Sequence, residues 1–182
     1  MSYQSIITHC APTLAGIKVG SLFSQRFEDL EDLRSKVRHC NRLLRHKGIR
    51  FLILRVRNGQ ALIYVYRQKQ LDTLLKQPAI QNFLAQMGYQ IFTQGACLSL
   101  LRTHLHREDF PHEIGIFLGY PLADIQAFIA NKGRNCVCEG CWKVYTNHEQ
   151  AQKTFAKYKK CTAVYGMRLA EGFDMTRLTV AV

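Results

Sequence analysis

One stretch of sequence decides the fold class: RFLILRVR (50–57), then Asn58-Gly59, then QALIYVYR (60–67). Both arms are rich in β-branched and aromatic residues, which are typical of strands. The Asn-Gly pair supplies the positive φ angles that a tight two-residue hairpin turn requires. The stretch therefore predicts a β-hairpin at the centre of an antiparallel sheet.

The segment before the hairpin has the pattern of a long helix. Over residues 27–47, apolar side chains recur every three or four positions, which is the spacing of one buried helical face. Ser24 is the expected N-cap and Gly48 the expected stop. Closer to the N-terminus, residues 4–8 read as a short strand that is followed by a loop.

The segments after the hairpin predict further helices and one strand. The helices are expected at 71–76, 79–87, 96–107, 111–119 and 121–133, and from Asn147 onward. CWKVYT (141–146) is the expected strand. The sequence therefore predicts an α+β fold, in which a small antiparallel sheet, made of the hairpin 50–67 and strand 141–146, is covered by several helices.

The bulk composition limits the class of protein. No linker divides the 182 residues, so a single domain over 1–182 is expected. Lys and Arg number 25 against 13 Asp and Glu, and the formal charge of +12 favours anionic partners. No apolar run reaches the ~18 residues of a membrane helix, and the N-terminus lacks a signal-peptide pattern. We therefore expect a cytoplasmic protein without a membrane span.

Three of the seven cysteines lie close together in CVCEGC (136–141). In a reducing compartment such residues are thiols, metal ligands or redox-active groups. Thiolates of Cys136, Cys138 and Cys141 could converge on one soft cation, which suggests iron, zinc or haem as a cofactor. Simple burial of the thiols is the competing interpretation, because free cysteine is among the most buried residue types.

The pair His9-Cys10 suggests nucleophilic chemistry. A neighbouring imidazole can lower the pKa of a thiol and leave a nucleophilic thiolate. Adjacent side chains on an extended chain point to opposite faces, so His112 would be the better base for Cys10 if the fold brings the two together. A cysteine-dependent enzyme that uses Cys10 is therefore kept as an alternative.

The segment FPHEIGIFLGYP (110–121) joins a histidine and a tyrosine. A zinc protease would need a second histidine at position 116, which is Ile116, so that class is excluded. The layout could instead place His112 and Tyr120 beside one pocket. The scattered histidines elsewhere, His104 among them, read as ordinary surface or boundary residues.

Basic residues crowd the region around the hairpin and a second stretch at 153–160. With Phe51, Tyr64 and Tyr66 available to stack bases, the chain could be a basic nucleic-acid-binding module. The signature of an RNA-recognition motif is absent, so nucleic acid is kept as a partner but is not favoured. The same charge suits an anionic small ligand or an acidic protein partner.

Three separated segments together resemble a known family. They are HCAPTLAGIKVGSLF (9–23), FPHEIGIFLGYPLADIQAFIANKG (110–133) and GCWKVYTNHEQAQKTFAKYKKC (140–161). The chain resembles an uncharacterised bacterial domain-of-unknown-function family, the 3793 family, which is found mainly in anaerobic Gram-positive bacteria. The resemblance implies a cytoplasmic bacterial protein with a single conserved domain, and it implies no catalytic residue.

These patterns lead to a binding protein as the first hypothesis. It would hold a metal, a metal cofactor or a small anionic ligand between the sheet and the helices. Lys18 and Lys143 would be the partners of an anion. The full set of candidate ligand-binding residues is His9, Cys10, Lys18, His112, Tyr120 and Lys143, with Cys136, Cys138 and Cys141 as candidate metal ligands.

Overall fold

The computed structural model describes residues 1–181 and confirms the α+β prediction. Its main sheet has three antiparallel strands in the order β1 (Gly20–Arg26), β3 (Gln60–Arg67), β2 (Ile49–Arg57). The hairpin β2–β3 turns at Asn58 and Gly59, whose φ angles of 50° and 70° are the positive values that the sequence predicted.

The third strand of this sheet is not the one that the sequence predicted. Within 141–146 only β5 (Lys143–Val144) is a strand, and it pairs with β4 (Cys138–Glu139) in a separate two-stranded sheet. The carboxylate of Asp124 accepts hydrogen bonds from the backbone N–H groups that follow β5, which takes them out of reach of a strand partner. The third strand of the main sheet is instead β1. Its seven residues all pair with β3, although Gly, Ser and Gln favour strands only weakly.

The prediction of a strand at residues 4–8 was also wrong, because these residues lie in helix α1 (Tyr3–Leu14). The buried side chains of this helix recur at helical spacing and include Ile6, Ile7, Cys10 and Leu14. Ser2 caps the first turn by accepting a hydrogen bond from the backbone N–H of Ser5.

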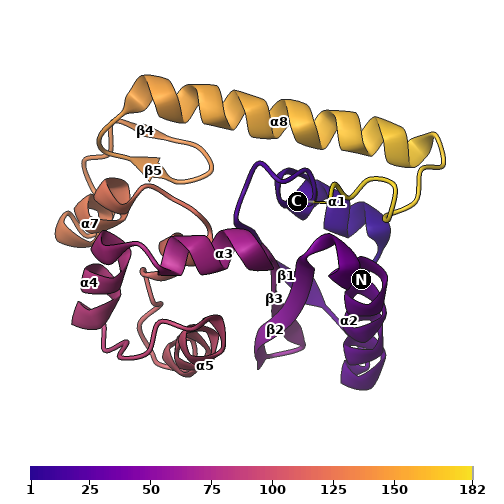
Figure 1. Ribbon diagram of the computed structural model, residues 1–182, viewed down its shortest axis with the longest axis horizontal. Coiled ribbons are helices and arrows are strands. Elements are labelled where there is room, and N and C mark those ends of the chain that lie inside the picture. The colour runs from indigo at the N-terminus through magenta and orange to yellow at the C-terminus, as the bar shows by residue number, and fades with distance from the viewer. Residues whose placement is uncertain (182) are drawn as a thin grey trace.

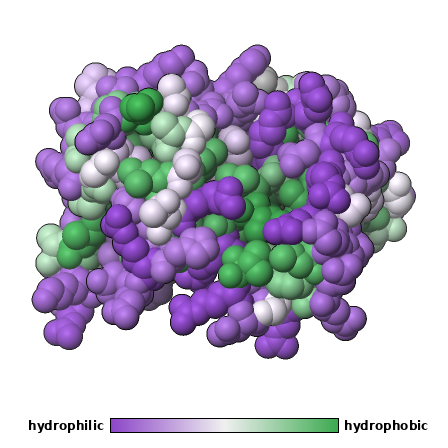
Figure 2. Space-filling view, turned by 90° about the horizontal axis from the view of Figure 1, so that it is seen from below, coloured by the Kyte–Doolittle hydropathy of each residue, from purple (hydrophilic) through white to green (hydrophobic). Residues whose placement is uncertain are grey.

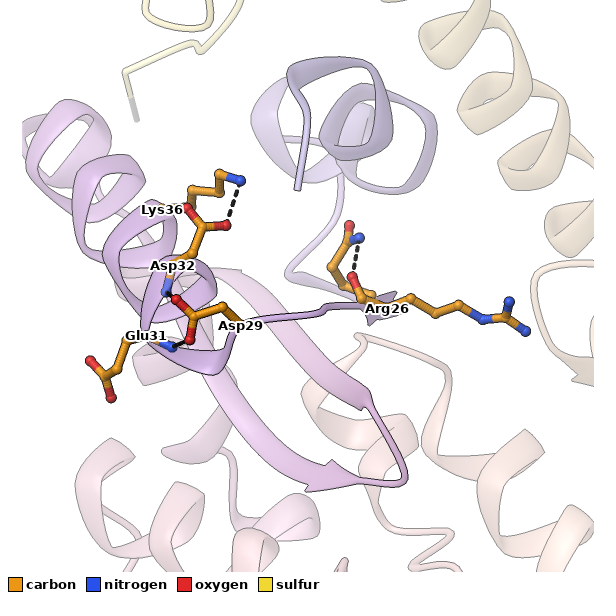
Figure 3. A network of polar contacts seen from close by, with 6 residues as sticks. Arg26, Asp29, Glu31, Asp32 and Lys36 are labelled. Carbon is orange, nitrogen blue, oxygen red and sulfur yellow. Dashed lines mark hydrogen bonds and ion pairs between the residues drawn. The ribbon is translucent and has the colours of Figure 1, made fainter.

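Most of the remaining helices lie where the sequence predicted them, with shifted ends. Their bounds are α2 (Leu30–Leu44), α3 (Gln68–Leu75), α4 (Pro78–Gln86), α5 (Gln94–His104), α6 (Ile114–Phe117), α7 (Leu122–Ala130) and α8 (His148–Ala170), and a short 3-10 turn, η1 (Arg45–Lys47), follows α2. The N-cap of α2 is Asp29 instead of Ser24, and it accepts hydrogen bonds from the backbone N–H groups of Glu31 and Asp32, as Figure 3 shows. Lys36 pairs with Asp32 one turn further along the same helix.

The sheet separates two hydrophobic cores. Alternate residues of β3 face opposite sides, so that Ile63 and Val65 pack with α1 and α2, whereas Tyr64 and Tyr66 pack with the helices from α3 to α7. Figure 1 shows these two groups of helices on either side of the strands, with α8 running across one end from the β4–β5 sheet to α1. The fold therefore places the short ribbon β4–β5 between α7 and α8.

On the face that is seen from below Figure 1, hydrophobic residues are exposed near the middle and hydrophilic residues surround them (Figure 2). The large apolar side chains that are exposed include Ile91 and Val137. Within residues 1–181, none of the helices has the length and apolar character that crossing a membrane requires.

Candidate functional site

An apolar pocket of about 170 Å³ opens between α6, α7 and the ribbon β4–β5. It contains three residues that the sequence singled out: His112, Tyr120 and Lys143. Its other lining residues are Ile114, Gly115, Asp124, Ile125, Phe128 and Trp142. Two stretches of the chain, 112–128 and 142–143, thus meet in one cavity, which is the usual place of a small-molecule site.

Four of the nine residues that line the pocket carry aromatic rings. The ring centroids of Tyr120 and Trp142 are 5.1 Å apart, and those of His112 and Phe128 are 4.9 Å apart in an edge-on arrangement. Gly115 allows this closure, because a Cβ atom there would lie 2.9 Å from the side chain of Ile125. A flat, mostly apolar ligand fits such walls best.

The ribbon side of the pocket is fixed by the carboxylate of Asp124, which is 3% exposed. One oxygen accepts a hydrogen bond of 2.8 Å from the indole N–H of Trp142. The other accepts bonds from the backbone N–H groups of Tyr145 and Thr146 and from the hydroxyl of Thr146. Because both oxygens already accept hydrogen bonds from the ribbon, the carboxylate positions this wall of the pocket and is not available to a ligand.

Lys143 supplies the positive charge of this pocket. Its ammonium group donates one hydrogen bond, 3.0 Å long, to the carbonyl oxygen of Gly133. An ammonium group has three N–H donors, so two are left for other acceptors. Together with the aromatic wall, this arrangement can hold the ring of a ligand in the pocket and pair with an anionic substituent.

A second cluster lies behind Tyr120 and is centred on Lys18, in the loop between α1 and β1. The Lys18 ammonium lies 5.5 Å from the centroid of the Tyr120 ring and 5.7 Å from that of Tyr158 on α8. Thiolates at Cys10 and Cys141 would raise the pKa of its ammonium group. Burial lowers the pKa of Lys18 and raises those of Tyr120 and Tyr158 to about 12 each.

The structure does not bring every candidate together. His9 stacks on Phe23 with centroids 5.1 Å apart at the surface of α1, whereas Cys10 is fully buried in the core between α1 and the sheet. Burial raises the pKa of the Cys10 thiol far above its ordinary value. The geometry therefore offers Cys10 neither an exposed position nor the ionised form that a nucleophile needs.

The structure does not gather the three cysteines of 136–141 into one group of three metal ligands in the described residues. Cys138 lies in β4 opposite Val144, and Cys141 is exposed at the end of the ribbon. In the described part of the chain, no group of three or more His, Cys, Asp or Glu residues is arranged to hold a metal ion. The hairpin aromatics predicted to stack bases are also unavailable, because Phe51, Tyr64 and Tyr66 are at most 9% exposed.

Sequence reasoning missed a buried polar network next to the pocket. The ring N–H of His104 donates a 2.6 Å hydrogen bond to a carboxylate oxygen of Glu113, and the hydroxyl of Tyr89 donates to the same oxygen. His104 and Glu113 are each 5% exposed, so His104 is a core residue and not a surface one. The signal was its spacing from Cys97 and Leu101, which places all three on the buried face of α5.

The comparisons with known proteins agree with the resemblance seen in the sequence. The model of the family described as "Protein of unknown function (DUF3793)" matches residues 6–179, and the chain belongs to this family. Comparisons with curated proteins and with solved structures found no match.

Proposed function

We propose that this protein binds a small anionic ligand, namely an aromatic carboxylate with a single ring. The observation that carries the proposal is the pocket in which His112, Tyr120 and Lys143 meet. A cavity of roughly 150 Å³ accommodates benzene, so a pocket of about 170 Å³ leaves space for one ring and a small substituent.

The charge of the ligand follows from the polar groups of the pocket that still have free hydrogen-bonding capacity. The carboxylate of Asp124 accepts hydrogen bonds from the ribbon, whereas the ammonium of Lys143 keeps N–H donors available. The formal charge of +12 also raises the local concentration of anions. The metal-binding alternative has less support, because no group of three or more metal ligands is found among the described residues. The alternative of an enzyme that uses Cys10 has less support because Cys10 is buried.

Fluorescence of Trp142 tests this proposal directly, because it is the only tryptophan and lines the pocket. The protein would be titrated with benzoate, with the neutral benzyl alcohol and with the cationic benzylamine. Benzoate is expected to change the emission saturably and to bind most tightly. Absence of a saturable change with benzoate, or equal binding of benzylamine, would refute the proposal.

A substitution at Lys143 separates the charge from the pocket. Lys143→Met keeps the apolar stem and removes the ammonium, so the affinity for benzoate should fall about tenfold, as expected for a lost charged hydrogen bond. The affinity for benzyl alcohol should stay unchanged, which would show that the pocket is intact although the bond to Gly133 is lost. Lys153→Met, on the exposed side of α8, is the matched control and should change neither affinity.

A further inference from the structure

We propose that the C-terminal half of α2 and the hollow next to it bind the phosphate backbone of double-stranded nucleic acid without reading its sequence. This inference goes beyond the proposed function, because it concerns a surface outside the pocket that Trp142 and Lys143 line. It rests on a cluster of cationic side chains from α2, η1, β2 and α3. The members of this basic face are Arg38, Arg42, Arg45, Arg50 and Lys69.

Three arginines of the basic face follow one side of a helix. Arg38, Arg42 and Arg45 are separated by four and three residues, so their side chains share one face, and all three are exposed. A rise of about 1.5 Å per residue spreads them over roughly 10 Å, a length that about three successive phosphates of one strand also span. The guanidinium of Arg50 joins them by donating a hydrogen bond to the carbonyl oxygen of Arg45. Because α2 lies at the edge of the molecule (Figure 1), a large partner can reach this face.

The row of arginines ends at a polar hollow of about 650 Å³. Arg45 and His46 line it from η1, and Lys69 lines it from the first turn of α3. Asp72 also lines the hollow, but its carboxylate is paired with the ammonium of Lys76 at 2.6 Å. The hollow therefore offers cationic side chains whose nearest carboxylate is already neutralised.

The two halves of α2 differ in how their charges are used. In the N-terminal half, Asp29 caps the helix, Glu31 pairs with Arg34, and Asp32 pairs with Lys36 (Figure 3). In the C-terminal half the arginines have no such neighbours: within residues 1–181, no ion pair includes a member of the basic face. These cations are therefore available to an anionic partner from outside the chain.

The chemistry of the basic face favours duplex phosphates over other polyanions. Four of its five members are arginines, whose guanidinium groups can form two parallel hydrogen bonds with a phosphate. The described residues of α2 and of the hollow include no Phe, Tyr or Trp. Proteins that bind single strands stack the bases on aromatic side chains, and the centre of a protein–protein interface is rich in them. A duplex, whose bases are already stacked, needs no such ring.

Fluorescence anisotropy with a short labelled DNA duplex tests the inference. About four phosphate contacts predict that affinity falls about a hundredfold between about 50 and about 200 mM salt, because each contact contributes about −0.9 to the slope of log affinity against log salt. A duplex of different sequence should bind equally well. The corresponding single strand and polyglutamate should both bind more weakly.

Matched changes of charge locate the site. Arg38→Gln and Arg45→Gln should each weaken binding to every duplex alike and reduce the salt slope by about one. The double variant Arg38→Gln/Arg45→Gln is compared with Lys157→Gln/Lys160→Gln, which removes the same charge from exposed positions of α8 and should leave binding unchanged.

Three results would overturn the inference. Equal weakening by the two double variants would show that the formal charge of +12 attracts DNA without a site. Equal binding of polyglutamate or of the single strand would contradict recognition of duplex phosphates, and absence of binding at low salt would exclude the partner. None of these results changes the titration of Trp142 with benzoate, so the two proposals can fail separately.

Discussion

The molecule contains two antiparallel hairpins that are built in different ways. The hairpin β2–β3 has strands of nine and eight residues, a backbone ladder along its length and a buried core on each face. The ribbon β4–β5 has two residues in each strand, and its position depends on the carboxylate of Asp124. Buried apolar area stabilises the first, whereas the second depends in addition on hydrogen bonds to one carboxylate.

This difference matters because only the ribbon touches the candidate pocket. The ribbon carries Trp142 and Lys143, which form one side of the cavity. Trp142 also packs on Phe155 of α8, with centroids 4.5 Å apart. A site built on a small, polar-anchored ribbon can be changed without unfolding the sheet, whereas damage to the sheet should affect the whole molecule.

The largest expected effect is at the centre of the sheet. Ile63 is fully buried in β3, and Ile63→Ala would remove apolar contacts and leave a cavity that packed neighbours cannot fill. We expect the free energy of unfolding to fall by about 3 kcal/mol. Urea unfolding would be followed by circular dichroism and by Trp142 fluorescence, and both signals should shift together. A shift in only one of them would show that sheet and ribbon unfold independently.

An intermediate effect is expected at Asp124. Asp124→Ala would leave the N–H groups of Trp142, Tyr145 and Thr146 without their acceptor, at a cost of about 2 kcal/mol. The loss should be local: Trp142 emission should move to longer wavelength and benzoate binding should disappear, while hydrogen exchange in β2 and β3 stays slow.

The control for this change is another aspartate that caps backbone N–H groups far from the pocket. Asp29→Ala removes the N-cap of α2 and should lower stability by about 1 kcal/mol without altering Trp142 emission. If Asp124→Ala left Trp142 emission and benzoate binding unchanged, the carboxylate would not be the anchor of the ribbon.

The same contrast explains which features could be predicted from the sequence. The hairpin was predictable because its signals are local, namely alternating strand residues and the turn at Asn58 and Gly59. His112 and Tyr120 could be placed at one pocket because they belong to one short segment. The position of 141–146 was not predictable, because it depends on Asp124, a residue about 20 positions earlier whose role has no local signature. Neither was β1, whose strand conformation comes from its pairing with β3.

The smallest effect is expected at Gly59 in the turn of β2–β3, and a matched substitution at Gly140 in the turn of the ribbon sharpens the comparison. Gly59→Ala meets open space but places a side chain at a φ of 70°, which should cost about 1 kcal/mol. In Gly140→Ala the new Cβ would collide with the ring of Phe155, which supports Trp142 from α8. Overpacking of this kind costs about 1–3 kcal/mol.

The two variants differ in where the cost should be visible. Gly59→Ala should lower the urea midpoint slightly and leave both Trp142 emission and benzoate affinity unchanged, because the turn of β2–β3 does not line the pocket. Gly140→Ala should displace Phe155 or the ribbon, change Trp142 emission in the folded state and weaken benzoate binding. Equal effects of the two substitutions on Trp142 would mean that the sheet and the ribbon respond as one unit, and that the pocket is held by the whole fold instead of by its polar anchor.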